Sequence, residues 1–160
     1  MIFNILALIA GISAKFPELD SYHASCQLTI ITQMDCKEAY GKILSSVNDL
    51  SGGEHYGGFM NLKLTADNRS IWAVRTSNVN DAVDDVQFRI NLDVTTDPHY
   101  PECEIDVRSR SRALSYWDKQ SNFCNLTNTL RNTSIMYTVP DWSGCKWHPT
   151  VKVPNACENY

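Results

Sequence analysis

The alternation of apolar and polar residues predicts a strand followed by one amphipathic helix near the start of the chain. Residues 22–33 are rich in β-branched side chains and poor in charge, which is typical of a strand. Beyond Asp35, apolar residues recur three or four positions apart, and Glu38 stands where a capping box needs an acidic side chain. The pattern breaks at Gly52, a residue type that commonly ends helices. We therefore expect a helix over 36–50 whose N-cap is Asp35.

Strand-like runs follow this helix at 59–66, 70–76, 85–94 and 102–108. In the first run, apolar side chains occupy alternate positions, which indicates that one face is buried. The residues expected on that face are Met60, Leu62, Leu64 and Ala66.

The last third of the chain gives weaker patterns. Residues 115–131 are ambiguous, and we expect a short helix with irregular ends there; residues 133–139 are a further strand candidate. Residues 140–160 contain three prolines and two cysteines, which favours a stapled loop over a regular element.

This order of elements predicts an α+β fold in which a curved antiparallel sheet packs on one amphipathic helix and disulfides stabilise the whole. Cystatin-like and NTF2-like folds have this order, although the inhibitory Gln-x-Val-x-Gly motif of cystatins is missing here. A lipocalin-like β-barrel is the alternative architecture. Fold analogy alone does not give function.

The first residues predict export. Residues 1–14 form an uncharged apolar run that ends in small residues, and Lys15 is the first charged side chain. This is typical of a signal peptide cleaved after Ser13 or Ala14, leaving 15–160 as a single secreted domain. A buried strand or a membrane anchor is the alternative, but the run is too short to span ~30 Å of hydrocarbon.

Cysteines and sequons agree with an oxidising, extracellular location. An even number of cysteines without a C-x-x-C pair favours disulfides over zinc or thioredoxin-like chemistry. The six cysteines are Cys26, Cys36, Cys103, Cys124, Cys145 and Cys157. Sequence does not fix their connectivity; we expect near neighbours to pair, 26 with 36, 103 with 124, and 145 with 157. Three asparagines lie in N-glycosylation sequons, of which we expect one or two to be used: Asn68, Asn125 and Asn132.

The net charge of −4 makes nucleic acid an unlikely partner, because phosphate-backbone binding depends on clustered Lys and Arg. No segment of the mature chain approaches membrane-spanning length, and no motif implies a cofactor or a metal. The expected partners are a small ligand, a lipid or a glycan, or alternatively another extracellular protein.

A dense segment near the C-terminal third carries a family resemblance. It resembles the pattern Cys-x-Ile, Ser-x-Ser, Ser, Asp, [Ser/Thr]-Asn-[Phe/Tyr]-Cys-Asn-Leu of uncharacterised small secreted proteins of microbial eukaryotes. The matching residues are Cys103, Ile105, Ser109, Ser111, Ser115, Asp118, Ser121, Asn122, Phe123, Cys124, Asn125 and Leu126. The chain departs from the pattern at Arg108, where a further cysteine is expected. The resemblance implies secretion and a shared fold. It carries no information about activity.

Catalytic and metal-binding arrangements are weakly supported. A reduced Cys124 could act as a nucleophile with His99 or His148 as base, but a disulfide is the expected state of an exported cysteine. Acidic and imidazole side chains that could ligate a metal have spacings that match no known site, and a capped turn and solvated loops are the favoured explanation. They are Glu54, His55, Asp84, Asp85, Asp97 and His99.

Arginines and aromatic residues supply the candidate binding site. Arg108, Arg110 and Arg112 alternate with serines, so on a strand their guanidinium groups share one face and could clamp carboxylate, phosphate or sulfate on a glycan or lipid head. A solvated sheet edge is the simpler explanation. Aromatic and polar residues of the dense segment could line a pocket, although core packing explains most aromatics. They are Tyr116, Trp117, Phe123, Asp118 and Asn122.

Three functions are consistent with these patterns. The first is a secreted, non-enzymatic protein that binds a small apolar, lipid or glycan ligand on the concave face of its sheet. The second is a secreted interaction, inhibitor or surface-coat domain that uses its exposed loops. The third is a small hydrolase, which is least favoured because no acid–base pair or activated nucleophile can be named from the spacing.

Overall fold

The computed structural model describes residues 15–51, 58–65, 67–76, 81–91, 102–115, 121–145 and 157. Within these ranges the chain forms six strands and two helices. In chain order they are β1 (Ser25–Thr32), α1 (Cys36–Asp49), β2 (Phe59–Leu64), β3 (Ser70–Thr76), β4 (Val83–Asn91), β5 (Cys103–Ser111), α2 (Ser121–Asn132) and β6 (Tyr137–Ser143). The predicted leader 1–14 lies outside the described residues.

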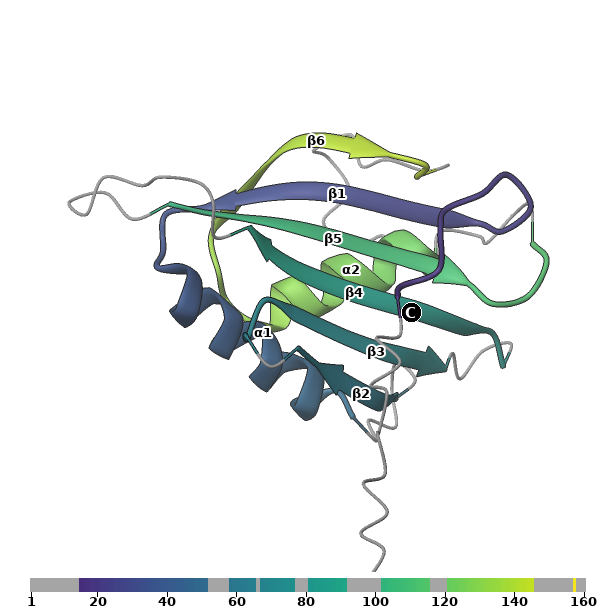
Figure 1. The fold of residues 1–160 in the computed structure, drawn as a ribbon, viewed down its shortest axis with the longest axis horizontal. Coiled ribbons are helices and arrows are strands. Elements are labelled where there is room, and N and C mark those ends of the chain that lie inside the picture. Colours follow the sequence, from purple (N-terminus) through teal and green to yellow (C-terminus); the bar gives the residue numbers. More distant parts are fainter. Residues whose placement is uncertain are drawn as a thin grey trace, which may run out of the picture.

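The six strands form one antiparallel sheet in the order β2-β3-β4-β5-β1-β6, and both helices cover the same face of it (Figure 1). The α+β class and the antiparallel sheet are confirmed. The edge strands β2 and β6 lie at opposite ends, so the sheet of the described chain is open and the alternative of a closed β-barrel is wrong. Among the described residues, the helices cover one face and the N-terminal segment lies on the other.

The hydrophobic core lies between the sheet and the helices. Every second residue of β1 and β5 is buried, as expected when one face of a strand packs against a core. Helix α1 contributes Ile43 and Val47 to this core, and α2 contributes Leu126 and Leu130. The apolar side chains of the strands and of the helices therefore form one layer. The other side chains of each strand lie on the face of the sheet that points away from this layer.

Helix α1 begins as the sequence predicts. The carboxylate of Asp35 accepts hydrogen bonds from the backbone N–H groups of Lys37 and Glu38, at 2.9 and 3.2 Å. These N–H groups have no partner within the helix, so an acidic N-cap satisfies them.

The predicted buried face of β2 is wrong. Phe59 is buried in the core, whereas Leu62 and Leu64 are exposed. The register between β2 and β3 shifts between Met60 and Lys63, and a shift of this kind exchanges the faces on which side chains lie, so Phe59 lies on the core face opposite Arg75. Beyond the shift Leu64 pairs with the buried Ile71, and it is exposed because β2 is an edge strand. Alternation in the sequence does not reveal such an irregularity.

Of the two later elements, one follows the prediction and one differs from it. Helix α2 confirms the short helix expected within 115–131, whereas β6 extends through Pro140 into the segment expected to be a loop. Strand β6 is an edge strand, and its register shifts beside Pro140, between Thr29 and Ile31 of β1. An edge strand at a bulge tolerates proline, which has no N–H to donate to the ladder.

Three disulfides cross-link the fold, and the predicted pairing of near neighbours is wrong. The observed pairs are Cys26–Cys145, Cys36–Cys103 and Cys124–Cys157, with Cα–Cα distances of 4.1, 5.0 and 5.2 Å. Strand order explains the first two pairs. Strand β1 lies between β5 and β6, so its start meets the residue that follows β6, and the start of α1 meets the start of β5. These proximities arise from tertiary topology and leave no trace in cysteine spacing.

Candidate functional site

The face of the sheet opposite the helices carries polar and charged side chains at its centre. Register places Gln87 of β4 directly beside Arg108 of β5, Trp72 of β3 beside Gln87, and Gln27 of β1 beside Arg108. We call these four residues the central row. Their spacing follows from the antiparallel ladder, in which directly paired side chains lie within contact distance of each other.

Buried polar atoms of this row lack partners. The Nε atom of Arg108 and the Oε1 atom of Gln87 are buried and have no hydrogen-bond partner among the described residues. The other end of the Gln87 amide donates to the hydroxyl of Ser70 at 2.9 Å. Buried polar groups are nearly always hydrogen-bonded in folded proteins, so unpartnered atoms of this kind need an explanation. A donor and an acceptor side by side are well placed to bind a ligand that offers both.

Positive charge lies next to the central row. Arg89 of β4 is exposed on the same face, diagonal to Arg108. No described carboxylate lies within 4.0 Å of either guanidinium group. The pKa of Arg108 is lowered by burial and by the charge of Arg89, and the Asp106 carboxylate opposes this shift. An anion bound between the two arginines would relieve their mutual repulsion.

The other two predicted arginines are held by carboxylates. Arg112, which directly follows β5, donates to both oxygens of Asp85 at 3.0 and 2.8 Å, and this hydrogen bonding raises its pKa. Trp72 donates its indole N–H to the same carboxylate at 3.0 Å. Arg110 donates to Asp20 at 2.7 Å. Of the three predicted arginines, Arg108 is thus available to a ligand, whereas Arg110 and Arg112 are already paired with carboxylates.

The N-terminal segment 15–23 crosses this polar face (Figure 1). Its Phe16 ring lies edge-on to the ring of Trp72, with 5.8 Å between centroids, and the Arg108 guanidinium lies 5.1 Å from the Phe16 centroid. Farther along, the Nδ1 atom of His23 lies 2.9 Å from both carboxylate oxygens of Asp20. The segment therefore contacts the central row through Phe16 and the side chain of Arg110 through Asp20. We call the contact between Asp20 and Arg110 the rim attachment.

The predicted aromatic pocket is only partly within the described chain. Tyr116, Trp117 and Asp118 lie outside the described residues. Phe123 and Asn122 lie on α2 and are buried against the sheet, with Phe123 in the hydrophobic core. Asn122 hydrogen-bonds to protein groups, so its role in the described structure is to join α2 to the sheet.

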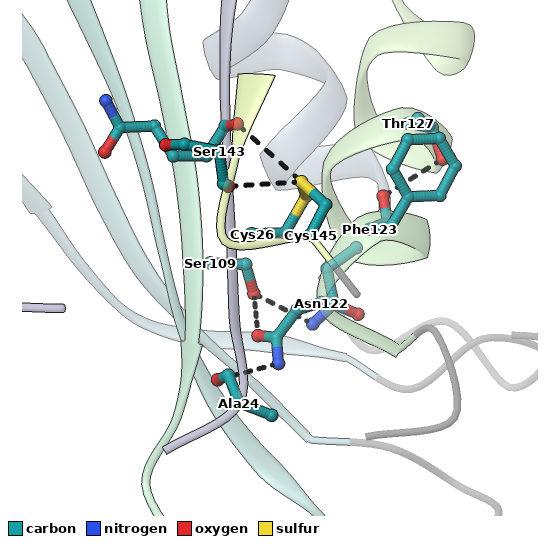
Figure 2. The surroundings of a disulfide bond; sticks show 10 residues. Ala24, Cys26, Ser109, Asn122, Phe123, Thr127, Ser143 and Cys145 are labelled. Atoms are coloured by element: carbon teal, nitrogen blue, oxygen red, sulfur yellow. Dashed lines mark hydrogen bonds between the residues drawn. A yellow bond between two sulfur atoms is a disulfide. The ribbon is translucent and has the colours of Figure 1, made fainter. Parts of the chain in front are cut away.

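A buried polar network forms this junction. The hydroxyl of Ser109 donates to the Asn122 carbonyl at 2.6 Å, and the Asn122 amide donates to Ser111 and to the Ala24 carbonyl, each at 3.0 Å. Figure 2 shows Asn122 pointing from α2 toward Ser109 and Ala24, next to the Cys26–Cys145 disulfide. The serines and asparagines of the dense sequence segment therefore meet in space as complementary donors and acceptors.

Sequence reasoning missed the charged half of this network. Asn125 accepts a hydrogen bond from Arg75 of β3 and donates to Asp84 of β4 at 2.7 Å, and Ser111 donates to Asp84 at the same distance. Burial lowers the pKa of Arg75, and the nearby Asp84 carboxylate opposes this shift. Arg75 and Asp84 stand in separate strands, and only their pairing in the sheet brings them to α2.

The remaining candidate ligands do not form a metal site. Asp84 and Asp85 point to opposite faces of β4, where each is hydrogen-bonded. Residues 54, 55, 97 and 99 lie outside the described chain. Among the residues that the structure describes, no group of three or more His, Cys, Asp or Glu side chains is placed to hold a metal ion. Cys124 is in a disulfide, so it is not a thiol nucleophile in this state.

An open groove of about 530 Å³ lies where β1 ends and β6 begins. Met136 in its wall is 89% exposed, and the pKa of Tyr137 is raised by burial. The lining residues are Ile31, Thr32, Gln33, Met34, Glu102, Ser134, Met136, Tyr137 and Thr138. None of the predicted site residues lines this groove.

The sequons differ in accessibility. Asn68 lies in the turn between β2 and β3 with a positive φ of 56°, and Asn132 is exposed at the end of α2. Asn125 is 1% exposed, and its amide nitrogen donates to both Asp84 and Ser109. A glycan on that nitrogen would displace these hydrogen bonds, which argues against the Asn125 sequon in the folded chain.

These observations define a class of protein: an α+β domain with an open antiparallel sheet, two helices on one face, a polar opposite face and three disulfides. Within the described ranges, no helix combines the length and the apolar character that a membrane span requires. Residues 18–132 match the family model described as Protein of unknown function (DUF1499), so the chain belongs to this family. Comparison with curated proteins and with solved structures gave no match.

The disulfides differ in how they lie relative to the matched region. The matched region ends with α2, so β6 and the last two cysteines lie beyond it. Only Cys36–Cys103 joins two cysteines within the matched region. The other two disulfides attach the C-terminal segment to β1 and to α2. Two disulfides therefore join the segment beyond the matched region to residues within it.

Proposed function

We propose that this protein is an exported, non-enzymatic domain that binds an acidic glycan on the open face of its sheet, at the central row. The observation that carries the proposal is the pair of buried, unpartnered polar atoms on Gln87 and Arg108. Leaving such groups unsatisfied costs about 1–3 kcal/mol each, and a ligand that hydrogen-bonds to both would recover this free energy.

The charge of the ligand follows from two arginines that have no carboxylate partner among the described residues. Arg89 and Arg108 lie diagonally on neighbouring strands, and their repulsion contributes to the lowered pKa of Arg108. A planar guanidinium group binds carboxylate, sulfate or phosphate through two parallel hydrogen bonds. An anionic group is therefore the expected anchor of the ligand.

The choice of a glycan rests on the rest of the row. Gln27 and Gln87 carry amides that can donate to and accept from hydroxyl groups, and the ring of Trp72 lies beside Gln87. Together these side chains extend across four strands in a line, which suits an elongated polymer with many hydroxyls. An anionic lipid headgroup shares the charge but does not need this extended row of amides.

Export is supported by the apolar leader in the sequence and by the three disulfides. Disulfides form and persist mainly in oxidising compartments, and acidic glycans are abundant at cell surfaces. Catalysis is not part of the proposal, because the site has no evident pairing of a nucleophile with a base.

The test compares Arg108→Gln with Arg131→Gln in the full chain, secreted from a eukaryotic host. Both variants lose one positive charge, but Arg131 lies in the last turn of α2, away from the open sheet face. A heparin-derived sulfated oligosaccharide is the main probe, with oligogalacturonate as the carboxylated probe and a neutral oligosaccharide as the uncharged one. We expect Arg108→Gln to weaken binding of the sulfated probe about tenfold or more, and Arg131→Gln to leave it unchanged.

Equal loss in the two variants would mean nonspecific attraction to charge and would overturn the proposed site. Binding to phosphatidic-acid vesicles but to no oligosaccharide would replace the glycan with a lipid. Absence of binding to all probes would overturn the proposal and would favour a protein-interaction role, for which the groove near Met136 is the place to begin.

A further inference from the structure

We infer that the N-terminal residues 15–20 form a displaceable strap over the central row, which an acidic glycan must lift to reach Arg108 and Gln87. This inference rests on the proposed function and adds its regulation. Residues 15–20 belong to no helix or strand, yet Phe16 is only 9% exposed because its ring lies on the sheet. The strap is thus fastened by side chains alone.

The contact between strap and row is chemically mismatched. Phe16 places an apolar ring against Trp72 and over the guanidinium of Arg108, which gives edge-on aromatic and cation–π contacts. The ring offers no hydrogen-bonding atom to the Arg108 Nε or to the Gln87 Oε1, and both stay unpartnered among the described residues. Gln87 is itself only 9% exposed, so solvent reaches it poorly. The closed strap therefore shields polar groups that it cannot satisfy.

A second attachment lies at the rim of the face. The Asp20 carboxylate accepts a hydrogen bond from Arg110 at 2.7 Å, and His23 lies 2.9 Å from it. The side chain of Asp20 is about one third exposed and that of Arg110 is 12% exposed, so this ion pair is partly buried. The ring contacts of Phe16 and this ion pair hold the strap without the ladder of backbone hydrogen bonds that holds a strand in the sheet, so opening the strap costs less than removing a strand.

Ligand binding and strap closure are consequently competing states of the same surface. A protein whose binding-competent state is a minority has its apparent affinity reduced by the fraction of open molecules. Weakening the strap without touching the row should raise affinity. This direction is diagnostic, since removing a residue that contacts the ligand lowers affinity.

The experiment measures the affinity of full-length secreted protein for the heparin-derived oligosaccharide. Phe16→Ala is expected to bind roughly five- to tenfold more tightly than the native protein. Leu114→Ala is the matched control, because it removes a comparable apolar side chain that is 79% exposed and does not contact Phe16 or Arg108 in the described structure. Asp20→Asn releases the rim attachment by a separate route and should raise affinity in the same direction, which covers the case in which Phe16→Ala does not fold.

Proteolysis by a glutamate-specific protease supplies an independent readout. Adding the oligosaccharide to the native protein should speed cleavage after Glu18, because the lifted strap is exposed to the protease. Slower cleavage at Glu18 would show that the strap closes on the ligand and would overturn the inference.

The outcomes separate the two proposals. If the native protein binds and Arg108→Gln does not, but Phe16→Ala and Asp20→Asn bind like the native protein, the strap is wrong and the binding site stands. Weaker binding by Phe16→Ala would make Phe16 part of the site and would also overturn the strap. If none of the proteins binds, the proposed function fails and the strap fails with it.

Discussion

The side-chain amide nitrogen of Asn125 on α2 lies 2.7 Å from a carboxylate oxygen of Asp84 on β4, and both residues are buried. The carbonyl of the same amide accepts from Arg75, so one asparagine bridges an acidic and a basic side chain. The amide carries its donor and its acceptor on two separate atoms of one short side chain, so it can bind both partners at once. This contact fixes α2 against the sheet within the family domain.

Replacing Asn125 with Ala should lower the free energy of unfolding by about 2–3 kcal/mol, because Arg75 and Asp84 each lose a hydrogen bond in a site that water does not reach. Chemical denaturation followed by circular dichroism measures the change. Asn48→Ala, at an exposed position of α1, is the control and should fall within about 0.5 kcal/mol of the native protein. A loss at Asn125 no larger than at Asn48 would contradict a stabilising network.

Replacing Tyr40 with Phe should stabilise the protein by about 1 kcal/mol. The hydroxyl of Tyr40 is buried without a hydrogen-bond partner among the described residues, and burial raises the pKa of the phenol. Removing an unsatisfied buried hydroxyl removes its desolvation penalty and keeps the ring in the core. The midpoint of urea denaturation checks this; a destabilised Tyr40→Phe would indicate that the hydroxyl has a partner in the folded protein.

Local sequence patterns predicted the elements whose environment is regular. Asp35 as an N-cap and strand 70–76 both depend on neighbours within one element. The β2 face failed because a register shift is a property of two strands. The polar network could be anticipated in part, because Ser109, Ser111, Asn122 and Asn125 stand close in sequence, whereas Arg75 and Asp84 join them only through strand pairing.

The candidate site depended even more on tertiary structure. Arg108 was named from its alternation with serines, but Gln27, Gln87 and Arg89 come from other strands and are ordinary polar residues in the sequence. Their shared position follows from the strand order, which places β5 between β4 and β1. No local pattern contains that information.

Peptide mapping under non-reducing conditions should recover the pairs Cys26–Cys145, Cys36–Cys103 and Cys124–Cys157. Among these, loss of Cys26–Cys145 through a double serine substitution should cost the most by the chain-entropy model, roughly 4–5 kcal/mol, because its cysteines are 119 residues apart. Thermal unfolding of the three double variants gives the ranking. Recovery of a peptide joining Cys26 to Cys36 would contradict the fold.

Expression in a eukaryotic secretory host should place glycans on Asn68 and Asn132 only. Both asparagines lie at turns or helix ends, whereas Asn125 is engaged in the network. Mass spectrometry after enzymatic deglycosylation in heavy-oxygen water marks each used site. A glycan at Asn125 on folded, secreted protein would show that the network does not form as described.

Acid should release the strap through Asp20. Hydrogen bonding by Arg110, and secondarily by His23, holds the pKa of Asp20 well below its usual value of 3.8. A carboxyl whose pKa is depressed by a contact stabilises that contact fully above the ordinary pKa and loses this contribution as the pH falls below it. Sulfate groups and arginines keep their charges in this range, and the carboxylates of Asp85 and Asp106 lie on the same face in both proteins. The advantage of Asp20→Asn over the native protein in binding the sulfated oligosaccharide should therefore shrink as the pH falls from neutral to below about 4. The ratio of the two affinities, measured side by side at each pH, cancels the effects of the other carboxylates. A ratio that does not change with pH would show that Asp20 does not hold the strap in place.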